Sequence, residues 1–189
     1  MAVLTGLATG AWGSTPVLLS WAVAGAAAGF LPHNFPRARM FMGDVSSAPL
    51  GLLLAALVVW LAAEHGAELA LPLALLHANF LLDMAITLAR RVVRGERWFE
   101  AHREHFYQRL IRGGKSHAVV TGAELGLQLV ALALLAGYVV AEPVLRPWLA
   151  GAVVLVWLAF FGWAERVFRR AQKSPASRSP PVAGIPLRG

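Results

Sequence analysis

The stretch "PLGLLLAALVVWLAA", Pro49 to Ala63, contains no charged side chain and decides the fold class. Similar apolar windows of about 20 residues recur along the chain, and a helix of that length crosses a bilayer. Ala and Leu dominate these windows rather than β-branched residues, which argues against buried strands of a soluble fold. The whole chain is 58% hydrophobic and only 14% charged, unlike a typical soluble domain. We therefore predict an all-α protein, a polytopic helical bundle integral to a membrane.

The apolar windows predict about five transmembrane helices, joined by polar segments. Residues 1–12 are Gly-rich and lack the basic start of a signal peptide, so they resemble part of a further span. A transmembrane domain is expected over residues 1–165. The basic, Ser/Pro-rich residues 166–189 are expected to form a disordered tail. The five windows lie at about Pro16–Leu31, Pro49–Ala63, Leu69–Ala89, Ala118–Val140 and Trp148–Phe161.

The distribution of Lys and Arg predicts the orientation of the chain in the membrane. Segments 32–47, 90–117 and 166–189 hold 2, 8 and 6 basic residues, whereas the remaining polar turns hold only Arg146. This asymmetry places the three basic segments in the cytoplasm. The same clustering explains the net charge of +7 without a nucleic-acid partner. The chain has no cysteine, which excludes disulfides and thiolate metal sites.

The loop "PHNFPRARMFMGDVSS", residues 32–47, interrupts the apolar sequence. One interpretation is a plain cytoplasmic turn whose two arginines obey the topology rule and whose Gly43 allows a bend. However, Asp44 sits at the membrane boundary without an adjacent basic partner. A lone carboxylate there suits Mg²⁺, which typically takes one or two carboxylates together with substrate phosphates. Asn34 could orient a substrate or a metal-bound water.

Two polar residues lie inside the third apolar window. Asp83 is either a functional acid, because an acid within a span is costly, or a partner of Arg90 or Arg91 near the span end. His77 lies deeper and is expected to form a hydrogen bond in helix packing rather than to catalyse a reaction.

The segment "RGERWFEAHREHFYQRLIRGGKSH", residues 94–117, interleaves aromatic and basic side chains. Such a segment next to a membrane usually lies on anionic headgroups. The alternative is a diphosphate-binding loop in which Arg103 and Arg109 hold phosphate oxygens. His102 and His105 would share one face of a helix, although no third metal ligand is close in sequence.

The loop "NFPRARMFMGDVSS" resembles that of the polyprenyl-phosphate N-acetylhexosamine-1-phosphate transferases, in particular the glycan-initiating branch called glycosyltransferase family 4. The superfamily also contains phospho-N-acetylmuramoyl-pentapeptide transferase. The stretch "DMAITLARRVVRGERWFEAHREHFYQRL" is similar to the end of a span and the histidine-bearing loop of the same family. The resemblance covers about Gly29 to His117.

This resemblance implies a reaction and a set of site residues. A UDP-N-acetylhexosamine would give its sugar 1-phosphate to undecaprenyl phosphate in the bacterial inner membrane, which would start an envelope glycan such as an O-antigen. The resemblance implies that Asp44 is the essential residue associated with Mg²⁺. It also matches Asn34 to the loop asparagine and His105 to the first residue of a histidine motif. Self-association as a homodimer is implied as well.

The chain departs from the family pattern at several points. Tyr107 and Gln108 stand where many members have histidines, and Ser46 replaces a usual glycine. No adjacent pair of acidic residues occurs, and members are about twice as long. The chain therefore resembles the C-terminal half of such an enzyme, and we expect it to be inactive without the missing half.

Two other functions also agree with the sequence. A non-catalytic membrane protein could use the basic loop and tail to bind anionic lipids or a glycan-assembly partner. A small transporter could use Asp83 and His77 as an ion path, but the distinctive residues lie in loops rather than mid-membrane.

Overall fold

The computed structural model describes residues 1–37, 39–40, 42–96 and 105–173, and it is helical without strands over these ranges. The long apolar windows form the long helices, because a chain without nearby water must satisfy its backbone hydrogen bonds internally. The elements are α1 (Ala2–Thr9), α2 (Thr15–Asn34), α3 (Gly43–His65), the 3₁₀ helix η1 (Ala67–Leu69), α4 (Ala70–Leu75), α5 (Ala78–Val93), α6 (Phe106–Arg112), α7 (His117–Val140) and α8 (Arg146–Lys173).

Four helices within the described ranges, α2, α3, α7 and α8, are long and apolar enough to cross a membrane. The third predicted span corresponds to η1 and α4 followed by α5, which together would make a fifth crossing. This pair is bent by 69° at the break between Leu75 and Ala78, which the sequence did not predict. The prediction of an all-α polytopic bundle is confirmed.

The bend is stabilised by polar groups that replace the lost helical hydrogen bonds. The Gln128 side chain of α7 donates to the Leu76 carbonyl oxygen at 2.9 Å, and the His77 ring lies 3.1 Å from the Leu73 carbonyl oxygen. A backbone carbonyl freed at a kink needs such a partner when no water is near. His77 is thus a hydrogen-bonding residue at a helix break.

Helix α8 is the centre of the packing. Its Trp157, Phe161 and Ala164 are buried against α7 and α6, where Leu135 and Leu110 are fully buried as well. By contrast, α2 packs mainly on α1 and α3. Within the apolar windows, 28% of α8 is buried in the molecule but only 11% of α2 and of α3. The large apolar side chains that remain exposed on these helices suit a lipid environment.

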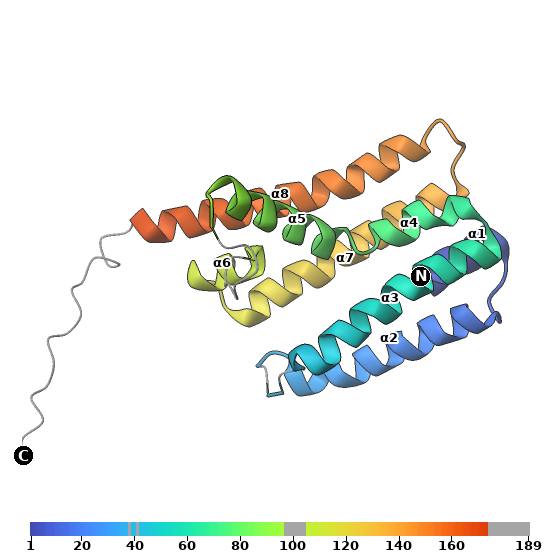
Figure 1. Cartoon of the computed structure of the whole chain (residues 1–189), viewed down its shortest axis with the longest axis horizontal. Helices are drawn as coiled ribbons and strands as arrows, with labels where there is room; N and C mark the ends of the chain where they lie inside the picture. The colour runs from blue at the N-terminus through green and yellow to red at the C-terminus, as the bar shows by residue number, and fades with distance from the viewer. Residues whose placement is uncertain (38, 41, 97–104, 174–189) are drawn as a thin grey trace, which may run out of the picture.

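Figure 1 shows that the basic segments share one end of the bundle. The connection between α2 and α3, helix α6 and the end of α8 all lie on the left, whereas the turns after α1, α3 and α7 lie on the right. This arrangement agrees with the predicted grouping of the basic segments.

Helix α8 continues well beyond the predicted fifth span, and this changes the expected domain boundary. Residues Arg166 to Lys173, assigned to a disordered tail, are helical. The reason is local, because Arg169 pairs with Glu165 one turn earlier and adds support to the helix. Residues 174–189 of the expected tail lie outside the described residues.

Candidate functional site at the basic end of the bundle

Asn34, the last residue of α2, organises the loop that leads to Asp44. Its side-chain oxygen accepts hydrogen bonds from the backbone N–H groups of Arg39 (3.0 Å) and Met40 (2.9 Å). Its amide nitrogen donates to the Met40 carbonyl oxygen at 2.8 Å. One side chain therefore ties together both ends of the loop. A direct contact of Asn34 with substrate stays a prediction.

Asp44 follows Gly43 at the start of α3. Gly43 has a φ of 62°, a left-handed conformation that glycine adopts without steric cost. The backbone turns sharply there and sets Asp44 in the first turn of a 23-residue helix. Peptide dipoles favour negative charge at such a position. The side chain of Asp44 lies outside the described part of the structure, so its ligands stay a prediction.

Asp83 and His105 meet, although 22 positions separate them in the sequence. The His105 Nδ1 atom lies 3.2 Å from Asp83 Oδ1, which also accepts hydrogen bonds from the Thr87 hydroxyl (3.0 Å) and the Phe106 N–H (3.4 Å). The suggested pairing of Asp83 with Arg90 or Arg91 is wrong. Arg90 and Arg91 instead form ion pairs with Glu165 and Glu96.

This contact orients a residue that the resemblance singled out. His105 is the N-cap residue of α6, and its side chain is 22% exposed, whereas that of Asp83 is 12% exposed. A carboxylate on one ring nitrogen fixes the tautomer and the orientation of an imidazole. Asp83 is therefore a positioning residue for His105 in this geometry.

Arg109 is buried and held by a carboxylate. Its Nη1 atom lies 2.7 Å from Glu165 Oε2, and the same oxygen lies 3.3 Å from Arg90 Nη1. The guanidinium also lies 5.9 Å from the ring centre of Phe106 and 5.3 Å from that of Phe168. The predicted role of Arg109 in holding phosphate oxygens is not tested by these contacts. They show that this arginine joins α6 to α8.

Arg103 and His102 lie outside the described residues, so the structure does not locate these two candidates. Among the described residues, no group of three or more His, Asp or Glu side chains could hold a metal ion. The side chain of Asp44 is not among them, so a Mg²⁺ site at this residue stays a prediction.

Glu165 is the residue of this candidate site that sequence reasoning missed. It accepts from three arginines: Arg90 of α5, Arg109 of α6 and Arg169 of α8. The available signal was its spacing of four residues from Arg169, which predicts a pair on one helix face. The two long-range partners had no signal in the sequence.

Together, these features define a class: a multi-pass α-helical membrane protein with a basic loop that ends in a Gly–Asp pair and a histidine–aspartate contact at one end. Comparison of the chain with known proteins narrows this class to a family. Residues 1–62, which contain Asn34 and Asp44, match the model of glycosyl transferase family 4. No solved structure matches the chain.

Curated relatives carry related names. The decaprenyl-phosphate N-acetylglucosaminephosphotransferase of Mycobacterium tuberculosis is 38% identical over 114 residues, which cover 54% of this chain and 28% of that protein. The protein of the same name from Mycobacterium leprae is 36% identical, with 54% and 29% covered. The phospho-N-acetylmuramoyl-pentapeptide-transferase of Synechococcus is 43% identical over 72 residues, covering 35% and 21%.

These matches relate the chain to the polyprenyl-phosphate N-acetylhexosamine-1-phosphate transferase superfamily, as the loop sequence predicted. The names of the family and of these relatives indicate phosphotransferase or glycosyltransferase chemistry. Each match spans less than a third of the relative's own length.

Proposed function

We propose that this chain forms part of an enzyme that transfers an N-acetylhexosamine 1-phosphate from a UDP-sugar to undecaprenyl phosphate. The products would be a lipid-linked sugar diphosphate and UMP, and the lipid product would start an envelope glycan. The observation that carries the proposal is the loop held by Asn34, which presents Asp44 at the start of α3 within the matched residues.

The residues of this chain have distinct roles in the proposed reaction. Asn34 keeps the loop folded, so Asp44 is held at the membrane boundary near the reacting diphosphate. Asp83 holds the imidazole of His105 at the same end of the bundle. Phosphoryl transfer needs mainly positioning and charge stabilisation from the protein. Mg²⁺, when bound with the diphosphate, would neutralise charge on its oxygens, and Asp44 is the proposed protein ligand.

The orientation in the membrane is part of the proposal. In the sequence, 16 of the 17 basic residues fall in the three segments 32–47, 90–117 and 166–189, and by the positive-inside rule these segments would face the cytoplasm at a bacterial inner membrane. The UDP-sugar is water-soluble and would approach from that side. The acceptor lipid would present its phosphate at the same boundary.

The test is a transfer assay on membranes that contain the longest reading frame spanning this chain. Radiolabelled UDP-N-acetylglucosamine, undecaprenyl phosphate and Mg²⁺ are supplied, and the lipid-linked product is measured. Asp44→Asn should lower the rate at least about 100-fold, because charge stabilisation at the reacting group is lost.

Glu142→Gln is the matched control, since Glu142 is an exposed acid in the turn before α8 at the other end of the bundle. We expect this variant to keep its rate. We expect no transfer from residues 1–189 alone, because the matched segment covers 28% of the mycobacterial enzyme. Full activity of Asp44→Asn would overturn the proposed role of the loop.

A further inference from the structure

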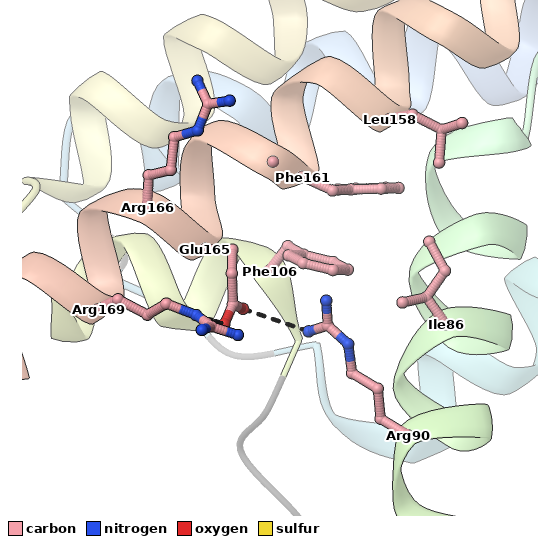
Figure 2. A pocket seen from close by; sticks show the side chains of 9 residues that line it. Ile86, Arg90, Phe106, Leu158, Phe161, Glu165, Arg166 and Arg169 are labelled. Atoms are coloured by element: carbon pink, nitrogen blue, oxygen red, sulfur yellow. Dashed lines mark hydrogen bonds and ion pairs between the residues drawn. The ribbon is translucent and has the colours of Figure 1, made fainter. Parts of the chain in front are cut away.

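A pocket of about 490 Å³ lies between α5, α6 and α8, apart from the loop that carries Asp44. Figure 2 shows its two ends. Ile86 and Leu158 lie at one end, and Arg90 and Arg169 lie at the other, around Glu165. The rings of Phe106 and Phe161, stacked at 4.4 Å between their centres, lie between these ends.

On both helices that flank the pocket, α5 and α8, apolar side chains are followed by arginines toward the same end of the bundle. On α5, Ile86 is followed one turn later by Arg90. On α8, Leu158 is followed by Arg166 and Arg169. A change from apolar to cationic side chains at one level of neighbouring helices marks a membrane boundary, where lysines and arginines meet headgroups. The pocket therefore spans the hydrocarbon edge and the headgroup layer.

The polar end of the pocket carries excess positive charge. Among the described residues that line the pocket, Glu165 is the one acid, whereas Arg90, Arg166 and Arg169 are basic. Glu165 is also shared with Arg109. Within the described residues, Arg166 forms no ion pair. Glu165 fixes Arg90 and Arg169 in place, with their remaining N–H donors left for a ligand. An anion with several acceptor oxygens suits this end.

Gly162 leaves space in the pocket because it has no side chain. Gly162 lines the pocket between Leu158 and Arg166, one turn from each, and a Cβ built there meets no atom within 4 Å. A larger side chain at this position would fill the pocket without displacing a neighbour. Since leucine favours a helix more than glycine does, such a change should not weaken α8.

We propose that this pocket binds one anionic lipid, with its phosphate group on the arginines and its apolar chain along Ile86 and Leu158. The ligand is defined by its chemistry, a phosphate joined to a hydrocarbon chain, which is found in phosphatidylglycerol and in polyprenyl phosphates. A free phosphate would leave the apolar end empty, and a neutral lipid would leave the arginines unused. This proposal does not depend on the transferase activity.

The experiment is native mass spectrometry of the full chain in detergent micelles. Four lipids are added separately: phosphatidylglycerol, undecaprenyl phosphate, zwitterionic phosphatidylcholine and uncharged undecaprenol. We expect one-to-one adducts with one or both anionic lipids. Gly162→Leu should weaken the adduct about tenfold by filling the pocket, and Arg166→Gln about fivefold by removing a phosphate contact.

Each variant has a control on the same helix. Gly151 also has no atom within 4 Å of a built Cβ, and it does not line the pocket, so Gly151→Leu should bind normally. Arg170→Gln removes an exposed arginine outside the pocket and should have little effect. Circular dichroism confirms folding of all variants.

The outcomes separate the possible ligands. Adducts with both anionic lipids support a site for phospholipids in general, and adducts with undecaprenyl phosphate alone support a polyprenyl phosphate site. The proposal is overturned if undecaprenol or phosphatidylcholine bind equally well. It is also overturned if Gly162→Leu and Arg166→Gln weaken binding no more than their controls do.

Discussion

Two regions at the same end of the bundle are built in different ways. The loop before α3 is organised within itself, because Asn34 bonds to backbone groups of Arg39 and Met40 only a few positions away. The corner formed by α5, α6 and α8 depends on distant residues, since Glu165 meets Arg90 and Arg109 across 75 and 56 positions. The loop is exposed, whereas Arg109 is buried.

The difference explains why the side-chain contacts of the second region could not be predicted from the sequence. A loop closed by neighbours leaves a short and readable pattern, and this pattern matched a known family. A corner closed by long-range ion pairs leaves scattered charges that resemble an ordinary membrane-surface segment. The comparison predicts that the corner governs global stability and that the loop governs local order and activity.

The largest effect on stability is expected for Glu165→Gln. The change removes the carboxylate shared by Arg90, Arg109 and Arg169, of which Arg109 is only 7% exposed in its side chain. Breaking a buried ion pair leaves a buried charge without its counter-ion and should cost about 3 kcal/mol. Unfolding in mixed micelles measures this loss, and Glu142→Gln, at an exposed acid, is the control. A loss below about 1 kcal/mol would contradict a structural role for the corner.

A smaller loss is expected for Asp83→Ala. The side chain accepts three hydrogen bonds, from His105, Thr87 and the backbone of Phe106, and their removal should cost about 2 kcal/mol. A double-mutant cycle with His105→Ala should show a coupling of about 1 kcal/mol. The cycle of Asp83→Ala with Arg90→Ala should be additive. Coupling of Asp83 with Arg90 and additivity with His105 would instead support an interaction between Asp83 and Arg90.

Asn34→Ala should change the loop without changing the bundle. Three hydrogen bonds are lost in an exposed segment, so the amides of Arg39 and Met40 should exchange about tenfold faster. The melting temperature should stay within about 2 °C of the parent value. Hydrogen-exchange mass spectrometry measures the loop, and His33→Ala tests a neighbouring exposed residue. Unchanged exchange in the Asn34 variant would show that the loop is held by other contacts.

The smallest effect is expected for Arg169→Gln. This arginine pairs with Glu165 at 2.6 Å, but its side chain is 72% exposed. Exposed pairs one turn apart contribute about 0.3–0.5 kcal/mol. The same unfolding assay applies, in low and high salt, since screening should remove most of this difference. A loss of unfolding free energy close to that of Glu165→Gln would mean that the ion pair of Glu165 with Arg169, rather than the one with Arg109, provides most of the stabilisation.

Much of the fold could be predicted from the sequence because the signal is local. Apolar windows predicted the five spans, and the basic residues predicted which segments group at one end. The 69° bend was missed because Leu69–Ala89 has the length of one continuous span, and the group that stabilises the break, Gln128, belongs to another helix. The extension of α8 to Lys173 was missed because a run of charges resembled a boundary.

The sequence by itself determined the class of protein, the apolar windows and the family resemblance, and it singled out Asp44 and Asn34 as candidate site residues. These depend on composition and on residues close together in the chain. Only the tertiary structure decided which charged and polar side chains contact each other. Asp83 contacts His105 instead of Arg90, and Glu165 forms ion pairs with three arginines. The physical reason is that a charge inside an apolar bundle must find its partner wherever helix packing brings one within reach.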